Sequence, residues 1–531
     1  MKLQAVLTPD EAIAVDEFCG RHAGIESLPL LAKFLRERFN LTLDLDPDII
    51  AGFVTDSSNL PGQAKALARP ASIRECAVLF RACYAAKIPI TVSAGKSNLT
   101  GSATPEQGVI ISTINMSKPE PKVDLAGKTV SAPVGMILED LRNEVLKASG
   151  GKLIYPVDPT SRADSTVGGT IACNASGFVP GETGATRAWV EEIEILLPNG
   201  LALQARRGQY VSGNGIFLID DGKHVVELPV PRYRRPAIKN AGGPFSAPDG
   251  VMDFIDLIVG SEGLFGLVTA CKLKLIDRPD DYLDLFFSLP EEKNAVKFLD
   301  FLRRRLGGKL GALSALEYFG VNCRGHMDHE DILFKGRDQA GIYLQVPLRN
   351  KTMEDAAEEW LGILMEADCD IDEQAIMLLD NDRNRKLFME SRHSLPARAL
   401  EVVKQRGTFT IMSDTVVPPE KFAEFLAFTH NLIKAEGLDY VAFGHFGDCH
   451  LHFTILPHKE QLERAVAVYD KMVAKSAELG GVYSGEHGTG KRKRKDFLQC
   501  YGPEGAAQVL ACKHAVDPDL LFNRGNVVAF P

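Results

Sequence analysis

The sequence predicts an α+β protein of two or three domains, with an antiparallel sheet in its second half. Its 531 residues exceed the size at which a single hydrophobic core usually stops growing. From about residue 70 to residue 275, strand-like and helix-like segments alternate around glycine-rich turns. After residue 277 the strands are separated by helices and end in a hairpin pattern, which is typical of an antiparallel sheet that carries helices.

The individual elements follow from local patterns. The first 50 residues contain two stretches with apolar residues at helical spacing, and a helix over 72–87 then leads into a strand over 88–94. Residues 205–250 are polar, irregular and rich in proline and glycine, so we treat them as a functional or packing insertion. In the second half we expect strands at 282–290, 312–320, 340–348, 409–418 and 440–457, and helices at 291–306, 352–367, 419–437 and 459–481.

Charge and cysteine content narrow the function classes. The formal charge is -10 at pH 7, and one basic run occurs, GKRKRKDF at 490–497, which is interpreted as a solvated helix start; this balance argues against nucleic acid as a main partner. The ten cysteines form no CxxC pair, so the spacing of iron–sulfur or zinc-ribbon ligands is missing. We find neither a secretory signal nor a run of about 20 apolar residues that could span a membrane. We therefore expect a cytoplasmic protein with free thiols; peripheral contact with a membrane and a homodimer stay open.

Three glycine-rich segments lie in the first half. The segment SAGKSNLTGSATP, at 93–105, follows an apolar strand and can present backbone N–H groups to an anion, usually a phosphate. It matches neither the P-loop nor the Rossmann fingerprint, and taken alone an ordinary hairpin turn explains it equally well. The segments at 158–200 and 257–275 add runs of small residues that let the backbone approach a flat ligand. Three such turns favour a large cofactor over three unrelated hairpins.

The segment GHFGDCHLHF, at 444–453, concentrates three histidines around a tight turn. A chain that doubles back there could bring His445 and His452 together, and His450 shares a face with His452 on an extended chain. Downstream, SGEHGTG places Glu486 beside His487 in a glycine-rich loop. Two imidazoles and one carboxylate form a metal site with open positions, although each histidine taken alone is more often structural than a ligand.

The order of these segments resembles a known family. Phosphate loop, STVGGTIACNASG, GSEGLFG, GHFGDCHLH, SGEHGTG and DPDLLFN together resemble the FAD-binding vanillyl-alcohol oxidase superfamily, in the branch of D-lactate, D-2-hydroxyglutarate and glycolate dehydrogenases. The resemblance runs from about residue 50 to the C-terminus and is weakest over 205–250. It implies an N-terminal helical segment (1–50), a two-subdomain FAD-binding domain (51–276), an α+β substrate or cap domain with an antiparallel sheet (277–480), and a C-terminal segment that returns to the FAD domain (481–531).

The resemblance also implies which residues hold FAD. The pyrophosphate would lie on the loop of Ala94, Gly95, Lys96, Ser97, Asn98, Leu99, Thr100 and Gly101. The flavin and ribityl chain would be lined by Asp158, Pro159, Ser165, Gly168, Gly169, Asn174 and Gly177, the adenosine half would lie near Glu262, Gly263 and Val268, and Asn523 would approach the ring. The loop departs from the usual Arg-Gly-Gly-Gly-Thr-Gly and contains no His or Cys, so we expect noncovalent FAD.

By the same resemblance, His445, His452 and Glu486 would ligate a divalent metal, with zinc first and manganese or iron as alternatives. His487 matches the general base. His450 occupies a position that is commonly Asn in the family, where it would face the substrate and could offer an N–H.

The substrate-binding arginine is assigned in the same way. Arg392 aligns with the arginine that clamps the substrate carboxylate, although the next residue, His393, departs from the usual Glu. Arg398 and Arg406 are interpreted as surface ion pairs. Some relatives that take a second carboxylate have a Lys where this chain has Met412, which favours a small monoacid.

The resulting expectation is a metal- and FAD-dependent dehydrogenase that oxidises a D-2-hydroxy acid, first of all D-lactate, by hydride transfer to flavin N5. D-2-hydroxyglutarate and glycolate dehydrogenases are the alternatives within the branch. An alkyl transferase of the ether-lipid synthase type and a noncatalytic flavin-fold subunit are the alternatives of other classes. Electrons would leave to a separate acceptor, namely an electron-transfer protein, an iron–sulfur subunit or a quinone, with dioxygen as the less favoured alternative.

Overall fold

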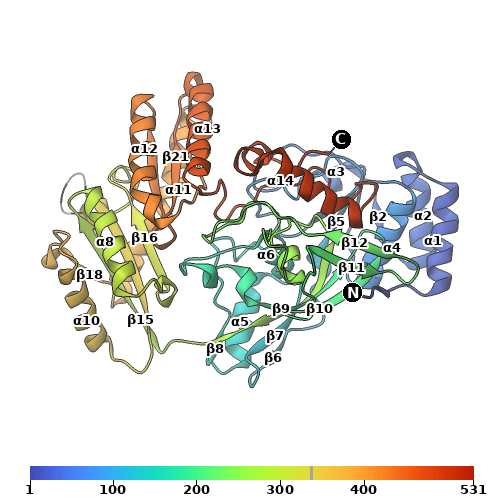
Figure 1. Ribbon diagram of the computed structural model, residues 1–531, viewed down its shortest axis with the longest axis horizontal. Helices are drawn as coiled ribbons and strands as arrows, with labels where there is room; N and C mark the ends of the chain where they lie inside the picture. Colours follow the sequence, from blue (N-terminus) through green and yellow to red (C-terminus); the bar gives the residue numbers. More distant parts are fainter. Residues whose placement is uncertain (335, 337–338, 531) are drawn as a thin grey trace.

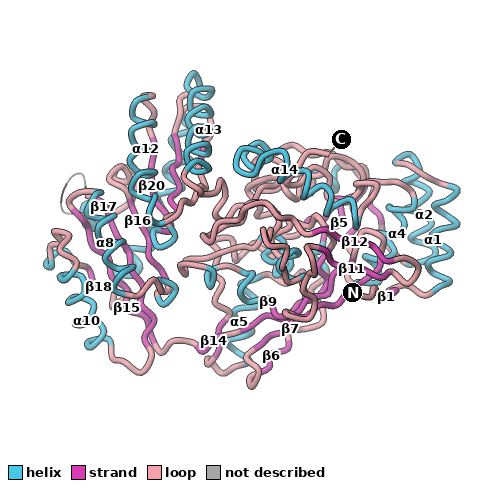
Figure 2. Tube along the Cα trace, viewed as in Figure 1, coloured by secondary structure: helices cyan, strands magenta, loops and turns pink. Residues whose placement is uncertain are grey.

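The computed structural model describes residues 1–531 except 335, 337–338 and 531. Figure 1 shows two bodies side by side: one large sheet with its helices at the left, and several smaller sheets with their helices at the right. Figure 2 shows that the second body contains long stretches of loop between its strands and helices. The predicted α+β class is confirmed, and so is the antiparallel sheet in the second half.

The body at the right contains two principal sheets. In the four-stranded sheet, β3, β5 and β4 are parallel and β2 is antiparallel, in the order β2 (Leu43–Asp44), β3 (Ala66–Ala68), β5 (Val109–Ser112), β4 (Ile90–Ser93). The six-stranded antiparallel sheet has the order β1 (Gln4–Ala5), β10 (Leu201–Arg206), β9 (Val190–Leu196), β13 (Leu267–Lys274), β7 (Thr129–Pro133), β6 (Lys122–Asp124). Two small pairs complete this body: β11 (Ile216–Asp220) with β12 (Val225–Pro229), and β14 (Ile276–Asp277) with β8 (Leu153–Ile154).

Helices cover these sheets. The two expected within the first 50 residues are α1 and α2, and a capping box between Thr8 and Glu11 fixes where α1 begins. The helices of this body are α1 (Pro9–Arg21), α2 (Leu28–Phe39), α3 (Pro47–Ala51), α4 (Ile73–Ala85), α5 (Leu138–Ala148), α6 (Val167–Cys173), α7 (Phe254–Ile258) and α14 (Arg494–Val516).

The body at the left is built on a seven-stranded antiparallel sheet (Figure 1). Its order is β18 (Met377–Leu378), β15 (Asp281–Leu289), β17 (Ala340–Leu348), β16 (Ala315–Phe319), β20 (Tyr440–His445), β21 (His450–Ile455), β19 (Ile411–Met412). Its helices are α8 (Glu292–Arg305), α9 (Glu330–Leu333), α10 (Met353–Glu366), α11 (Asp382–Gln405), α12 (Phe422–Ala435) and α13 (Leu462–Glu478).

Hydrophobic packing shows how the chain divides between the two bodies. One buried cluster joins residues between Leu3 and Leu275 with residues between Val473 and Val528. Two further clusters contain only residues between Leu283 and Met472. The last part of the chain therefore packs with the first half, although the residues of the large antiparallel sheet lie between them in the sequence.

Two local features differ from the expectations. The irregular stretch 205–250 contains the β11–β12 hairpin, and β12 packs against α14. The strand expected over 409–418 is only the short β19, and beyond it Asp414 forms an isolated bridge to Ser484 while Val416 forms isolated bridges to Val482 and His450. This deviation brings residues after β19 against the SGEHGTG loop.

Candidate active site

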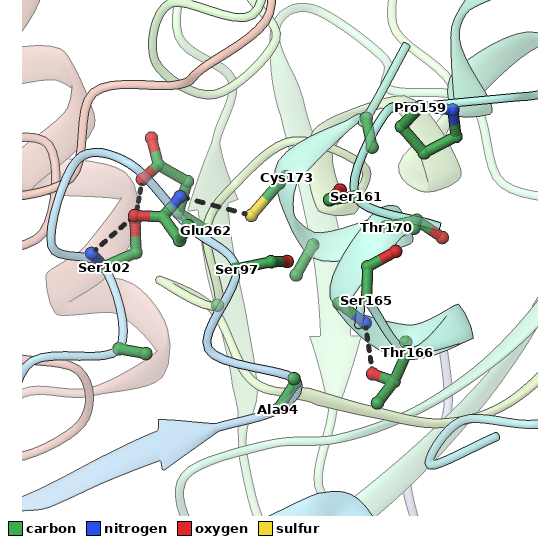
Figure 3. Close-up of a pocket in the computed structure, with 18 of the residues that line it drawn as sticks. Ala94, Ser97, Ser102, Pro159, Ser161, Ser165, Thr166, Thr170, Cys173 and Glu262 are labelled. Atoms are coloured by element: carbon green, nitrogen blue, oxygen red, sulfur yellow. Dashed lines mark hydrogen bonds between the residues drawn. The ribbon is translucent and has the colours of Figure 1, made fainter. Parts of the chain in front are cut away.

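A cavity of about 390 Å³ lies where the three glycine-rich segments meet. In Figure 3 the loop that carries Ala94 and Ser97 faces α6, which begins after Thr166. Thr166 accepts the Gly169 N–H and so caps α6 at its first turn. A Cβ on Gly177 would lie 2.7 Å from the Asp158 backbone, so the close approach of these two segments requires glycine there.

Most of the residues expected to hold FAD line this cavity. They are Ala94, Gly95, Lys96, Ser97, Asn98, Leu99, Asp158, Pro159, Ser165, Gly168, Gly169, Gly177, Glu262, Gly263, Val268 and Asn523. Thr100, Gly101 and Asn174 are not among the lining residues. Thr100 instead accepts the Lys491 and Arg492 N–H groups on its carbonyl, and Asn174 accepts the Arg187 N–H.

The cavity wall contains an unpaired hydroxyl. Among the described residues, Ser165 Oγ is buried and has no hydrogen-bond partner, although Ser165 lines the cavity. A buried polar atom without a partner is unfavourable, so this hydroxyl fits a polar ligand that the cavity would hold. The wall residue Glu262 is different, because its carboxylate accepts the backbone N–H groups of Thr489 and Gly490, each at 2.7 Å. Glu262 thus ties the cavity to the SGEHGTG loop.

At one end of the cavity, histidines from the β20–β21 hairpin meet Glu486. His445 ends β20, while His450 begins β21 and His452 follows two residues later. His445 Nε2 lies 3.2 Å from Glu486 Oε2, and His452 Nε2 lies 3.2 Å from Glu486 Oε1. One ligand atom from each of the three histidines and from Glu486 lies within 4.8 Å of the others. Such a set of imidazoles around a carboxylate fits a divalent metal such as zinc.

Each imidazole is anchored by its other nitrogen. His445 Nδ1 lies 2.8 Å from Glu317 Oε1, and His452 Nδ1 lies 3.3 Å from the Ser413 carbonyl. Burial alone would raise the pKa of Glu317, but His445 and Arg392 outweigh burial and lower it to about 2. Outer partners of this kind fix the ring orientation and tautomer of metal-binding histidines. The pattern therefore supports metal binding at the inner nitrogens.

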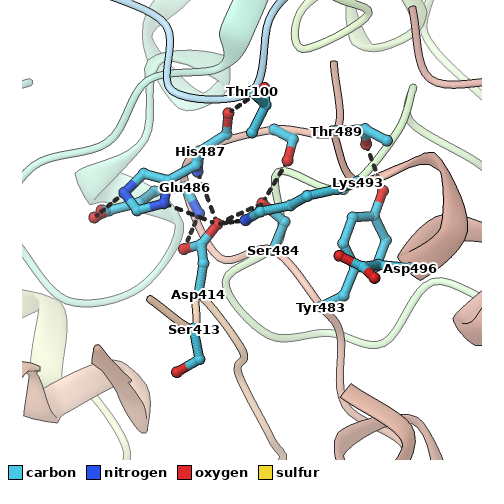
Figure 4. Close-up of polar contacts among 12 residues, drawn as sticks. Thr100, Ser413, Asp414, Tyr483, Ser484, Glu486, His487, Thr489, Lys493 and Asp496 are labelled. Carbon is cyan, nitrogen blue, oxygen red and sulfur yellow. Dashed lines mark hydrogen bonds and ion pairs between the residues drawn. The ribbon is translucent and has the colours of Figure 1, made fainter. Parts of the chain in front are cut away.

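Asp414 organises the loop that carries Glu486 and His487, as Figure 4 shows. Its carboxylate accepts the His487 N–H at 3.1 Å and the Glu486 N–H at 3.2 Å, and it pairs with Lys493 Nζ at 2.7 Å. The Ser484 hydroxyl also donates to Asp414, at 2.6 Å. Asp414 is fully buried, and the neighbouring His487 and Lys493, together with the hydrogen bond to His450, lower its pKa against the effect of burial.

The His487 ring lines the cavity beside this network. Its Nδ1 lies 3.4 Å from Asp414 Oδ2, and its Nε2 lies 3.6 Å from Glu486 Oε1. Burial lowers the pKa of His487 to about 4, so the ring is neutral at pH 7. A neutral imidazole whose Nδ1–H faces a carboxylate has Nε2 available to accept a proton.

Arg392, on α11, approaches the site from behind an aromatic ring. Its Nη2 lies 3.2 Å from Glu317 Oε2, and its guanidinium carbon lies 4.2 Å from the centre of the Phe178 ring. Phe178 lines the cavity, whereas Arg392 is not among the lining residues. The two other arginines form the expected ion pairs at the surface, Arg398 with Asp328 and Glu401, and Arg406 with Asp439.

The insertion at 205–250 contributes a buried cation. Lys239 Nζ lies 3.2 Å from Glu486 Oε2 and 3.5 Å from Asp448 Oδ2, and its side chain is only 4% exposed. Burial disfavours the ammonium form, but Glu486 and Asp448 outweigh burial and raise the pKa of Lys239. Lys239 is therefore charged and holds two carboxylates that would otherwise repel each other.

Replacing Lys239 is expected to destabilise the metal-free protein. The Lys239→Met change leaves Glu486 and Asp448 as buried carboxylates without this cation, a loss on the order of 3–5 kcal/mol. Urea unfolding of the metal-free full chain, compared with Lys495→Met in the exposed Lys495–Asp470 pair, measures the effect. Equal midpoints for the two variants would show that Lys239 does not stabilise the site.

Three side chains of the site, those of Glu317, Asp414 and Lys239, could not be identified from a sequence motif. Glu317 and Asp414 are single acidic residues within apolar segments, and Lys239 lies in the irregular insertion. The only available signal was an acid in the middle of an otherwise buried strand pattern, as in SALEYF, because such a charge needs a partner.

Within the part of the chain that the structure describes, no helix combines the length and the apolar character needed to cross a membrane.

Two family models match this chain. The model described as an FAD binding domain matches residues 64–206, and the model described as the C-terminal domain of FAD linked oxidases matches residues 286–527. The matched ranges contain two of the three glycine-rich segments, those at 93–105 and 158–200. They also contain His445, His450, His452, Glu486 and His487.

Curated relatives match over most of their length. A D-lactate dehydrogenase of Anaerostipes hadrus is 28% identical over 498 residues, covering 90% of this chain and 93% of the relative. The glycolate oxidase subunit GlcD of Bacillus subtilis is 24% identical, covering 87% and 89%. A D-2-hydroxyglutarate dehydrogenase of Xanthomonas citri pv. viticola is also 24% identical, with the same coverage of 87% and 89%.

Solved structures show the same fold at low identity. p-Cresol methylhydroxylase with substrate bound matches with a TM-score of 0.68 at 14% identity, covering 99% of both chains. Alkyldihydroxyacetonephosphate synthase matches with a TM-score of 0.65 at 16% identity, covering 92% of this chain and 84% of that chain. These two matches show the fold alone, whereas the two family models and the curated relatives together show that the chain belongs to the FAD-linked oxidoreductases of the vanillyl-alcohol oxidase superfamily, in the branch that contains the D-lactate, glycolate and D-2-hydroxyglutarate enzymes.

Proposed function

We propose that this protein is a dehydrogenase that oxidises a D-2-hydroxy acid, with D-lactate as the first candidate, to the corresponding 2-oxo acid. The observation that carries the proposal is the convergence of His445, His452, Glu486 and His487 at one end of the glycine-lined cavity. The names of the curated relatives support this substrate class. The unpaired Ser165 hydroxyl supports FAD in the cavity, and the inner nitrogens of His445 and His452 support a metal beside Glu486.

The residues of the site have distinct roles in the proposed reaction. When bound, the metal supplies Lewis acidity toward a hydroxyl group and the flavin supplies a two-electron acceptor. His487 Nε2 takes the hydroxyl proton, and Asp414 holds the other ring nitrogen and the backbone of the loop in place. Arg392 attracts the substrate carboxylate, and Glu317 fixes both Arg392 and His445. Positioning of this kind supplies a large share of catalysis for so small a substrate.

The charges of the site favour a substrate with one carboxylate. Four carboxylates and three cations surround the cluster: Glu317, Asp414, Asp448 and Glu486, and Lys239, Arg392 and Lys493. With neutral histidines, as metal ligation requires, the net charge is about -1, and a divalent metal changes it to about +1. A monocarboxylate then makes the buried site neutral, whereas a dicarboxylate leaves an uncompensated negative charge.

Anaerobic titration of the FAD-bound protein tests the proposal. D-lactate should bleach the flavin absorbance and L-lactate should not, and D-2-hydroxyglutarate should bleach it more slowly than D-lactate. Removal of the metal with a chelator should slow bleaching, and re-addition of zinc, manganese or iron should restore it. A flavin that dithionite reduces but that no 2-hydroxy acid in the panel reduces would rule out this substrate class and leave the alkyl-transfer alternative to be tested.

The reduced flavin has to be reoxidised by an electron acceptor. The clusters of metal-ligating side chains found among the described residues contain no cysteine, so none of them has the ligands of an iron–sulfur centre. We therefore propose a separate acceptor, namely an electron-transfer protein, an iron–sulfur subunit or a quinone.

A further inference from the structure

Of the three histidines in the β20–β21 hairpin, His450 is the one without a role in the proposed reaction. It is fully buried at the start of β21. The sequence led us to expect that it offers an N–H to the substrate, but its Nε2 lies 2.9 Å from Asp414 Oδ1. A neutral imidazole has one N–H, and here that N–H is donated to Asp414. The nitrogen that remains, Nδ1, is an acceptor.

The hairpin places His450 among the expected metal ligands. The register pairs His445 directly with His450 across the two strands, and His452 lies two residues further on the same face. The ring centres of His445 and His450 are 5.4 Å apart, and those of His450 and His452 are 4.6 Å apart. The ligand atoms of all three histidines and of Glu486 lie within 4.8 Å of one another. This proximity is what a shared ion requires.

The three rings also follow one pattern of support. Each directs one nitrogen to an outer acceptor: His445 to Glu317, His452 to the Ser413 carbonyl, and His450 to Asp414. This arrangement is the usual one for a histidine whose other nitrogen binds a metal. Among the described residues, His450 Nδ1 is buried without a hydrogen-bond partner. This buried acceptor nitrogen therefore has no partner among those residues, and a metal ion would supply one.

We propose that His450 binds the metal through Nδ1, so that the centre contains three imidazoles and one carboxylate. The proposal rests on the metal site of the proposed function and adds a ligand to it. A third imidazole raises the preference for zinc, iron or nickel over manganese, since imidazole suits the former and carboxylate or water the latter. It also leaves one position fewer for substrate oxygen atoms than a centre with two histidines would have.

X-ray absorption of the zinc-loaded, FAD-bound full chain without substrate counts the imidazoles directly. We expect three, and two would overturn the inference while leaving the rest of the metal site intact. Because this measurement uses the wild-type protein, it does not depend on the folding of any variant. Absence of bound zinc would overturn the inference together with the metal part of the proposed function, whereas D-2-hydroxy acid oxidation is tested separately by flavin bleaching.

Metal affinity provides the second measurement. In competition with a chromogenic chelator, His450→Asn should weaken zinc binding by about a hundredfold or more, since even outer partners of metal ligands contribute 10- to 100-fold. The zinc-to-manganese affinity ratio should fall in the same variant. His430→Asn is the matched control, because His430 is a buried histidine of the same body that pairs with Glu292 and belongs to none of the metal-ligating groups. An unchanged zinc Kd in a folded His450→Asn protein contradicts the proposal.

Discussion

The Glu486→Gln variant is expected to retain FAD and lose both its divalent metal and its reaction with D-2-hydroxy acids. Glu486 is the only carboxylate that lies within 3.2 Å of both His445 and His452 among the described residues. An amide keeps the size of the side chain but removes the charge that binds a cation. Because Lewis-acid assistance contributes several kcal/mol, flavin reduction should slow by at least about a thousandfold.

Two measurements separate the parts of this expectation. Metal analysis and anaerobic stopped-flow reduction are made on the same protein, and flavin content shows that the cavity is intact. Glu478→Gln, on the exposed end of α13 where Glu478 pairs with Lys475, is the control and should behave as wild type. A Glu486→Gln protein with wild-type metal content would show that the carboxylate is not a ligand.

The Asp414→Ala variant is expected to be strongly destabilised, because one buried carboxylate supports several groups. The change leaves Lys493, whose side chain is 7% exposed, without its ion-pair partner, and it leaves the His487 and Glu486 N–H groups without their acceptor. Breaking a buried ion pair from one side costs about 3–5 kcal/mol. Asp414→Asn, which retains an acceptor oxygen, should be affected less.

Urea titration followed by flavin fluorescence measures this loss in the full chain. The double variant Asp414→Ala/Lys493→Met should recover part of it, since it removes the unpaired cation as well. If the double variant is no more stable than Asp414→Ala, the ion pair does not explain the loss, and the backbone hydrogen bonds of the loop do.

The fold and the outline of the site could be predicted because their signals are local. Glycine runs such as Gly168–Gly169 and the segment from His445 to His452 are contiguous in sequence; the structure places the glycines and His445 in the wall of one cavity, and His452 contacts Glu486, which lines the same cavity. Glu317, Asp414 and Lys239 could not be found in this way, because each acts through partners brought close only by folding. The direction of the His450 N–H likewise depended on Asp414, 36 positions away in the chain.

The cavity wall is completed late along the chain. Asn523 accepts the Val92 N–H at 2.8 Å and donates to the Gly263 carbonyl at 2.8 Å, bridging β4, which leads into the first glycine-rich segment, and the segment at 257–275. Gly263 precedes Asn523 by 260 positions, and the whole seven-stranded sheet is encoded between them. Asn523 is therefore synthesised after the whole seven-stranded sheet, so this part of the cavity wall can close only once that sheet has left the ribosome.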